Sequence, residues 1–248
     1  DIFLVLLAPL YFVWENPKML LFFQALSTAF AGIFVFLISR KITKNSYLSL
    51  IFSISFYLNF WIHEQTLFDF HAISIATLFV LCAFYYMVKK KTILFFILLG
   101  LASTTKENAF LLISMFGLYF MLRKRWIQGI LLTTIPLIIF YLLVAYIIPQ
   151  ARGGAHFALG GYEYLGSSVV DIITNAMNNP NLLINQLVNH STFDYLKSHF
   201  ISTGYLALLS PLYLLFTILI WPSICFRAIL DIGLIIITLE LSLFHFSI

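Results

Sequence analysis

The stretch that decides the fold is an apolar run between two basic clusters: KKK at 89–91, TILFFILLGLASTTKENAFLLISMFGLYFML at 92–122 and RKR at 123–125. The run holds 31 residues, whereas one crossing of a bilayer needs about 20 apolar residues and two need about 40. Lys106 and Glu107 interrupt the run near its middle. The run therefore forms either two short helices that rise and return around the charged pair, or one long tilted helix.

The basic clusters discriminate between these two possibilities. Cytoplasmic loops of membrane proteins are enriched in Lys and Arg, and a third cluster contains Arg40, Lys41 and Lys44. Two short helices keep all three clusters on the cytoplasmic side, whereas one long helix places residues 123–125 outside. Each short helix, of about 14 residues, would cover about 21 Å of a hydrocarbon core about 30 Å thick. We therefore predict a short helical hairpin over residues 92–122, with its charged turn in a recess on the outer side.

The composition indicates that the whole chain lies in a membrane. Of 248 residues, 62% are hydrophobic and 10% are charged, against about 25% charged in a typical soluble domain. So few charged side chains cannot cover a soluble globule, and neither disorder nor nucleic-acid binding is supported. We expect an all-α polytopic integral membrane protein of the plasma or cell membrane, with about seven or eight membrane-embedded helices.

Apolar runs of spanning length predict the organisation of the chain. We expect a membrane-embedded bundle at 1–148, an extracytoplasmic loop at 149–199 and C-terminal membrane helices at 200–248, all in one membrane domain. The short run 2–14 is interpreted as a truncated span or as a segment lying at the outer interface. The chain begins on Asp1 directly before this run, so we expect a fragment. The other expected spans are 19–39, 46–62, 72–88, 127–148, 200–221 and 228–246.

Polar side chains on the predicted outer side are candidates for chemistry, because polar groups are costly exceptions in such a chain. The stretch HEQTLFDFH at 63–71 supplies His63, Glu64, Asp69 and His71. Asp69 and His71 stand two residues apart, a spacing that can place a base beside its orienting partner or bring two metal ligands together. The alternative interpretation is a solvated loop at the membrane interface that has no chemical role.

Lys106 and Glu107 form the second candidate group. A charge at bilayer depth costs about 2.5–3.5 kcal/mol, so a recessed pair is retained at some cost. Lys106 could meet Asp69, and Glu107 could meet His71. Such pairs would either join two hairpins as a structural contact or form part of a functional site.

Several ligands suit these residues. Zinc held by His63, His71 and a carboxylate lacks the usual spacing of zinc ligands on a helix, so we assign no metal ligands. A divalent cation bound through Asp69 and a phosphate fits better, and it is the cofactor that we expect. In the long loop, Arg152 could clamp a phosphate and Tyr164 could stack on a sugar or an isoprenoid chain. Lipid headgroups and an aromatic belt at the interface are the alternative interpretations of these two.

The order of several short motifs resembles one family. That order is similar to the predicted-membrane-protein family catalogued as domain of unknown function 2079, over residues 1–221. The family commonly reads DFHP where this chain has Ala72 in place of the proline. The motifs are LAPLY at 7–11, LL at 20–21, QAL at 24–26, FDFH at 68–71, KE at 106–107, IIP at 147–149, GG at 153–154 and YLG at 164–166.

That family is similar to the GT-C superfamily of polytopic glycosyltransferases, which use polyprenyl-phosphate-linked sugars. The resemblance implies inverting transfer of a sugar on the outer face. An acidic residue of the first large outer loop then acts as general base or orients the acceptor. It also implies that this chain begins after the first membrane helix and most of that loop, so the catalytic role is not given to Asp1.

The resemblance implies that the residues matching its motifs form the second half of such a site. Asp69, His71, Lys106 and Glu107 are expected to be catalytic. Two alternatives remain open: a transporter or lipid flippase built on broken helices, and a non-catalytic membrane scaffold. The expected partners are membrane lipids and a polyprenyl-phosphate sugar, without nucleic acid. The expected substrate-binding residues are His63, Glu64, Arg152 and Tyr164.

Overall fold

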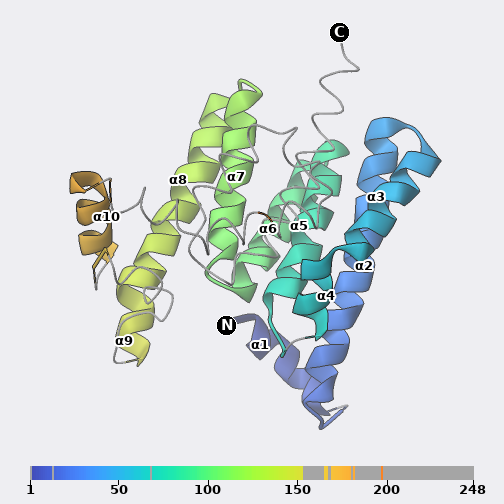
Figure 1. Cartoon of the computed structure of the whole chain (residues 1–248), viewed down its shortest axis with the longest axis horizontal. Coiled ribbons are helices and arrows are strands. Elements are labelled where there is room, and N and C mark those ends of the chain that lie inside the picture. The colour runs from blue at the N-terminus through green and yellow to red at the C-terminus, as the bar shows by residue number, and fades with distance from the viewer. Residues whose placement is uncertain are drawn as a thin grey trace.

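The computed structural model describes residues 2–12, 14–67, 69–152, 165–166, 169–179, 181 and 197. Within these residues the regular structure is entirely helical, so the all-α prediction is confirmed for them (Figure 1). A 3-10 helix, Ala8–Phe12, and a π-helical turn, Leu143–Ile147, join neighbouring α-helices. The α-helices are α1 (Ile2–Leu7), α2 (Lys18–Thr43), α3 (Ser46–Leu58), α4 (Phe60–Leu67), α5 (Ile73–Val88), α6 (Thr92–Thr105), α7 (Ala109–Leu122), α8 (Trp126–Leu142), α9 (Ile148–Arg152) and α10 (Val169–Asn178).

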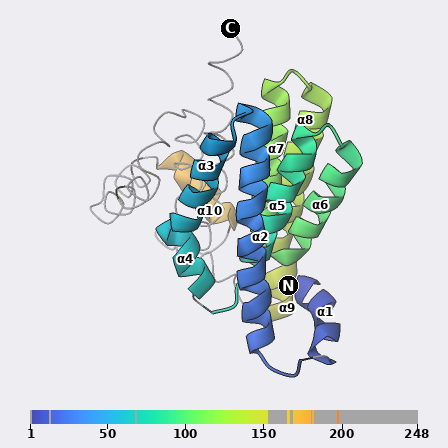
Figure 2. The same cartoon turned by 90° about the vertical axis from the view of Figure 1, so that its right-hand side faces the viewer.

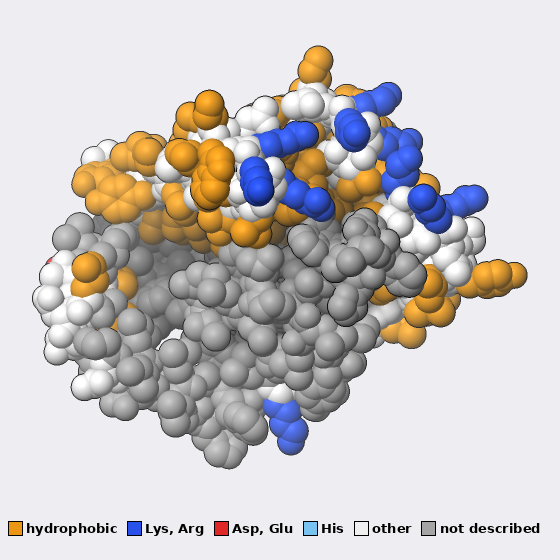
Figure 3. Space-filling model, turned by 90° about the horizontal axis from the view of Figure 1, so that it is seen from above, with side chains coloured by type: hydrophobic (Ala, Val, Ile, Leu, Met, Phe, Trp, Pro, Cys, Tyr) orange, Lys and Arg blue, Asp and Glu red, His pale blue; other side chains and the backbone are white. Residues whose placement is uncertain are grey.

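Three antiparallel turns lie at the same end of the helical bundle. They join α2 to α3, α5 to α6 and α7 to α8, and two views at right angles place them together (Figures 1 and 2). Seen from above, Lys and Arg side chains gather on this face (Figure 3). The structure thus confirms that the three basic clusters share one end; that this end is cytoplasmic stays a prediction. We call it the basic end, and it comprises Arg40, Lys41, Lys44, 89–91 and 123–125.

The charged stretch between two of these clusters forms the expected short hairpin. α6 and α7 have 14 residues each, and residues 106–108 turn between them. At about 1.5 Å per residue each helix is about 21 Å long, whereas α2, with 26 residues, is about 39 Å long. The turn therefore stops short of the far end of α2, as Figure 1 shows. One long tilted helix over residues 92–122 is wrong.

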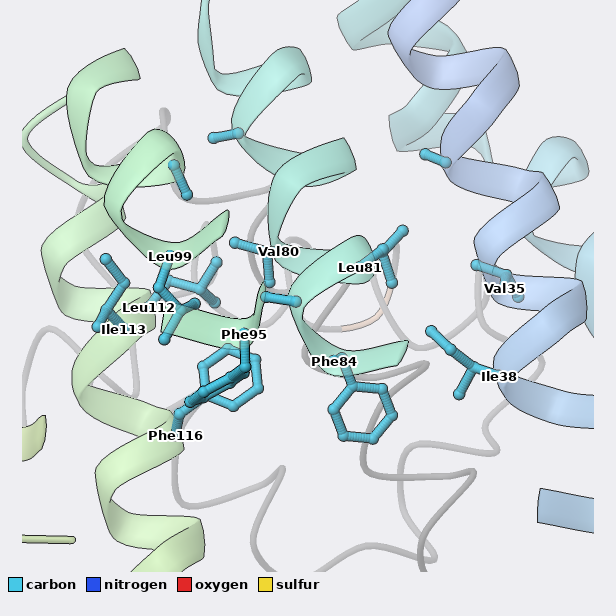
Figure 4. Packing of buried hydrophobic residues seen from close by; sticks show 14 of the residues in the cluster. Val35, Ile38, Val80, Leu81, Phe84, Phe95, Leu99, Leu112, Ile113 and Phe116 are labelled. Carbon is cyan, nitrogen blue, oxygen red and sulfur yellow. The ribbon is translucent and has the colours of Figure 1, made fainter. Parts of the chain in front are cut away.

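α5 is the central helix of the core. It packs against α2 on one side and α6 on the other, and most of its side chains between Ile73 and Phe84 are buried. The ring of Phe95 in α6 packs edge-on against Phe116 in α7, with centroids 5.5 Å apart. Such contacts join helices when lipid provides no hydrophobic drive between them. The core residues shown in Figure 4 are Val35, Ile38, Val80, Leu81, Phe84, Phe95, Leu99, Leu112, Ile113 and Phe116.

α7 and α8 approach each other backbone to backbone at two glycines. A Cβ atom on Gly117 would lie 2.2 Å from Oγ1 and 2.5 Å from the backbone N of Thr133. A Cβ atom on Gly129 would lie 2.8 Å from the carbonyl oxygen of Gly117. Small residues at such crossings are typical of helices packed in membranes. By contrast, Gly100 in α6 has no atom within 4 Å of its Cβ position.

The outer surface of the bundle is strongly apolar. Two helical stretches among the described residues, Lys18–Thr43 and Trp126–Ala151, are long and apolar enough to cross a membrane. The shorter helices α3, α5, α6 and α7 are also apolar. Ile51, Ile93 and Ile127 are 60%, 78% and 77% exposed, a surface that suits lipid far better than water. The structure therefore fits a membrane protein, while the number of crossings stays a prediction.

The expected span 46–62 is wrong as a single helix. α3 ends at Leu58, Asn59 is extended (φ −66°, ψ 123°), and α4 then carries the polar stretch as far as Leu67. The imidazole Nε2 of His63 bonds to the carbonyl oxygen of Tyr57, a group that the break leaves without a helical partner. The carbonyl oxygen that the break exposes is therefore hydrogen-bonded by a side chain four residues beyond the break. Residues 63–67 of the polar stretch 63–71 are therefore helix and not loop.

The helix expected over 127–148 extends past Pro149, while the extracytoplasmic loop 149–199 stays a prediction. The helix of α8 continues through Leu143–Ile147 and α9 to Arg152. Because Pro149 has no N–H and its ring crowds the carbonyl four residues earlier, the helix widens into a π turn before it instead of ending. The expected loop 149–199 also contains α10. The expected C-terminal spans in 200–248 lie outside the described residues.

The N-terminal run 2–14 forms α1 and the 3-10 helix Ala8–Phe12. Phe3 and Leu7 are buried against Ile75 of α5, and the ring of Phe3 lies 5.8 Å from that of Phe79. These contacts place α1 near the ends of α5 and α6 that are farthest from the basic end (Figure 2). Its assignment as a truncated span or an interfacial segment stays a prediction.

Candidate functional site

Two polar segments lie level with each other at the end opposite the basic end. α5, with 16 residues, ends at the turn 89–91, and α6, with 14 residues, begins after it. The two helices therefore run back from the same level over similar lengths. The linker 69–72, which precedes α5, is therefore at the same depth as the turn 106–108, which follows α6. Ala72, Thr105 and Asn108 are buried at this level. We call the linker and the turn together the polar end; they bring the expected catalytic residues to one depth.

A buried glutamine of α2 holds the linker in place. The side chain of Gln24 is fully buried, with 0% of its surface exposed. Its Nε2 donates to the carbonyl oxygens of Gln65 (2.9 Å) and Thr66 (3.3 Å), at the end of α4. Its Oε1 accepts a hydrogen bond from the backbone N–H of His71 (2.7 Å). One amide thus satisfies backbone groups at the end of α4 and within the linker.

Further hydrogen bonds fix α4 against its neighbours. Nε2 of Gln65 donates to Oγ of Ser74 in α5, at 2.7 Å. The hydroxyls of Thr66 and Thr28 lie 3.3 Å apart, which joins α4 to α2. Gln24, Gln65 and Ser74 were not among the expected site residues. The sequence signal for Gln24 was its polar amide inside the apolar run 19–39. Such groups are retained in membrane helices only where they have partners.

The imidazole of His71 is oriented by backbone and not by the neighbouring carboxylate. Its Nδ1 lies 2.7 Å from the carbonyl oxygen of Asp69. A carbonyl can only accept, so Nδ1–H donates in this contact. The carboxylate of Asp69 is exposed and His71 is half-buried. Asp69 therefore orients the ring of His71 through its main-chain carbonyl. The Asp69 carboxylate is not used in this contact.

Lys106 and Glu107 occupy the turn as predicted, and both are half-buried. Their carbonyl oxygens accept from the N–H groups of Ala109 (3.0 Å) and Phe110 (3.2 Å), so the two residues begin the first turn of α7. The pairings of Lys106 with Asp69 and of Glu107 with His71 stay predictions. Among the described residues no group of three or more His, Cys, Asp and Glu side chains could hold a metal ion.

Two of the residues expected to bind substrate are on α4, and the side chains of the other two lie outside the described parts. His63 and Glu64 are exposed on α4, and the ring of His63 contacts the end of α3. Arg152 is the last residue of α9, but its side chain is outside the described structure. Tyr164 is outside the described residues. Their assignment to substrate binding stays a prediction.

The sidedness of the two ends can be measured with single cysteines. Cys82 and Cys225 would be removed, and one cysteine placed at 69, 106 or 123, then exposed in intact cells to a membrane-impermeant thiol reagent. We expect labelling at 69 and 106, because they share one depth, and none at 123, because it lies at the basic end. Labelling of all three in permeabilised cells is the control. Labelling at 123 in intact cells would contradict the expected orientation.

Comparison with known proteins agrees with the motif order. A family model described as predicted membrane protein, DUF2079, matches residues 1–224. No match was found among curated proteins or among solved structures. The matched region contains α1 to α10, including the linker 69–72 and the turn 106–108. Because the match covers most of the chain, this protein belongs to the DUF2079 family of predicted membrane proteins.

Proposed function

We propose that the chain forms part of a membrane glycosyltransferase that takes a sugar from a polyprenyl-phosphate carrier on the outer face of the membrane. The observation that carries this proposal is the recessed turn 106–108, which lies level with the linker 69–72 in an otherwise apolar bundle. Charged groups at membrane depth are costly and usually mark a functional site. The similarity of the DUF2079 family to GT-C enzymes suggests the same reaction.

The proposed roles follow from the chemistry of the four residues at the polar end. Lys106 pairs with the phosphate of the carrier. Glu107 or Asp69 accepts the proton of the acceptor hydroxyl. The hydroxyl oxygen attacks the anomeric carbon, the bond from that carbon to the phosphate oxygen breaks, and the lipid phosphate leaves with inversion at the sugar. The imidazole of His71 orients the acceptor through a hydrogen bond. His63, Glu64, Arg152 and Tyr164 contribute to binding.

A reconstituted assay tests these roles. The chain in proteoliposomes would be given polyprenyl-phosphate mannose or polyprenyl-phosphate glucose with a membrane lipid extract as acceptor, and release of polyprenyl phosphate would be measured. We expect Glu107→Gln to lower release on the order of 100-fold, because a general base supplies about that much. Lys106→Gln should weaken carrier binding about tenfold through loss of a charge-assisted hydrogen bond.

Matched controls lie at the first residue of α2 and just before it. Glu15→Gln and Lys18→Gln remove exposed charges of the same kinds outside the polar end and should leave release and binding unchanged. The proposal fails if the wild-type chain binds neither carrier. It also fails if both Glu107→Gln and Asp69→Asn transfer as well as the wild type.

The break at Asn59 and the π turn before Pro149 favour a second candidate, a transporter or lipid flippase. Such proteins build their binding sites from discontinuous helices. Uptake of solute or lipid by proteoliposomes that is lost in Lys106→Ala, without release of polyprenyl phosphate, would favour it. A scaffold without activity would instead show altered assembly alone when these charges are neutralised.

A further inference from the structure

Two turns of the basic end are copies of one motif. The sequence YYMVKKK at 85–91 returns as YFMLRKR at 119–125. In each copy the middle basic residue has left-handed backbone, with φ 60° at Lys90 and 61° at Lys124. The N–H of the following residue bonds to a carbonyl five residues earlier, which closes the helix end in a Schellman motif. These bonds join Lys91 to Tyr86 and Arg125 to Phe120, each at 2.9 Å.

Lysine is an unexpected residue for this backbone. Glycine is usual at a left-handed helix end because a Cβ atom is unfavourable there. Lysine nevertheless occupies the position in both copies and also at Lys44 (φ 55°), at the end of α2. A conformational cost accepted at three turns indicates that the positive charge at the tip of each turn has a use.

Aromatic rings support the other cations of the two turns. Nζ of Lys89 lies 4.5 Å from the centre of the Tyr85 ring, and the guanidinium of Arg123 lies 5.5 Å from that of Tyr119. The guanidinium of Arg125 lies 5.9 Å from the Phe120 ring. Such contacts hold a cation near the level of the ring while leaving it accessible. The six basic side chains of the two turns are all exposed.

The two turns are neighbours. The ring of Phe120, at the end of α7, lies 5.8 Å from the ring of Phe95, in the first turn of α6. Phe95 follows the first turn by one helical turn and Phe120 precedes the second, so the helix ends that carry the two cationic clusters lie side by side. Figure 3 shows Lys and Arg side chains grouped on this face. None of the described Asp and Glu residues lies in these turns, since they are at 15, 64, 69, 107 and 171.

Exposed aromatic side chains mark the level of a membrane interface beside this surface. Trp126, at the start of α8, is 61% exposed, and Tyr47, at the start of α3, is 83% exposed. Trp and Tyr gather at the headgroup level of membrane proteins, where one end of the ring is apolar and the other is wet. Exposed isoleucines and leucines follow along the same helices. The cations therefore lie where lipid phosphates would be.

We propose that the paired turns 89–91 and 123–125 bind the phosphate groups of anionic phospholipids in the leaflet that the basic end faces. The cations provide charge complementarity, and the aromatic rings fix their depth. Near an anionic membrane surface each Lys or Arg contributes an attraction worth about a fivefold change in binding. The surface is independent of the polar end and of any transfer reaction there.

A double variant separates charge from folding, because it changes the two in opposite directions. Lys90→Gly with Lys124→Gly removes two charges and places glycine where the backbone is left-handed. Purified full-length chain would be reconstituted in mixtures of phosphatidylcholine with brominated phosphatidylglycerol or brominated phosphatidylcholine, and quenching of tryptophan fluorescence measured. We expect wild type to prefer phosphatidylglycerol and the double variant to lose about fivefold of that preference per charge.

The same double variant should unfold at a higher temperature in neutral detergent, because the left-handed positions are relieved. Lys90→Arg with Lys124→Arg is the matched control and should keep the preference. High salt should abolish the preference in wild type. An unchanged preference in the glycine variant, no preference in wild type, or a preference lost together with a lower unfolding temperature would each overturn the proposal.

Discussion

Gly117→Ala will destabilise the protein by about 3 kcal/mol, whereas Gly100→Ala will not destabilise it at all. The new Cβ at position 117 would lie 2.5 Å from the backbone N of Thr133, and backbone cannot move aside as a flexible side chain can. α7 and α8 must therefore separate, and the hydrogen bond from Thr133 Oγ1 to the carbonyl oxygen of Ser114 (3.4 Å) is lost with them.

The comparison with Gly100 isolates the close approach from the general effect of removing a glycine. Position 100 is an exposed helix interior with open space around its Cβ, where alanine is favoured by about 0.5–1 kcal/mol. Gly32→Ala should fall between the two, because its Cβ would meet the ring of Tyr57, which can swing away. Thermal unfolding of the three variants in one detergent measures the series. Equal unfolding temperatures for the variants at 100 and 117 would disprove the close packing of α7 on α8.

Gln24→Leu will destabilise the polar end by about 3 kcal/mol and loosen the linker 69–72. Leucine fills a similar volume but leaves the N–H of His71 and the carbonyl oxygens of Gln65 and Thr66 without their side-chain partner. Each backbone group left unpaired away from water costs about 1–3 kcal/mol. The loss is larger than for an ordinary hydrogen bond, because one side chain serves three groups.

Two measurements together identify this loss. Chemical unfolding in detergent gives the change in stability, and the rate at which a cysteine at position 69 reacts with a thiol reagent reports on the linker. Both should change in Gln24→Leu. Gln128→Leu, an exposed change of the same type in α8, is the control and should change neither. A normal labelling rate at position 69 in a destabilised Gln24→Leu protein would show that the amide does not hold the linker.

The hairpin 92–122 could be predicted from the sequence because two simple quantities define it. The number of residues between the basic clusters sets its length, and the expected sidedness of Lys and Arg favours two short helices over a single crossing. The position of Lys106 and Glu107 in its turn followed from the same count. These arguments concern neighbouring residues in the chain, so they need no knowledge of tertiary contacts.

The other features depend on contacts that no local pattern carries. Gln24 meets His71 across 47 positions of sequence, so its partners could not be named in advance. The break at Asn59 lies inside an apolar run, and it is satisfied by the ring of His63 from the next helix. The continuation of α8 through Pro149 requires a π turn, whereas proline in a sequence usually indicates a helix end.

The brevity of α6 and α7 has a consequence for the biogenesis of this protein. Neither 14-residue helix is long enough to be retained in a bilayer by itself. A polar turn at membrane depth is tolerated only when protein surrounds it, and the helix that packs most closely on α7 is α8, which the ribosome makes later. We therefore expect α6 and α7 to remain at the translocon until α8 emerges and then to enter the lipid as a pair. The integration of these two helices would thus wait for the synthesis of a third.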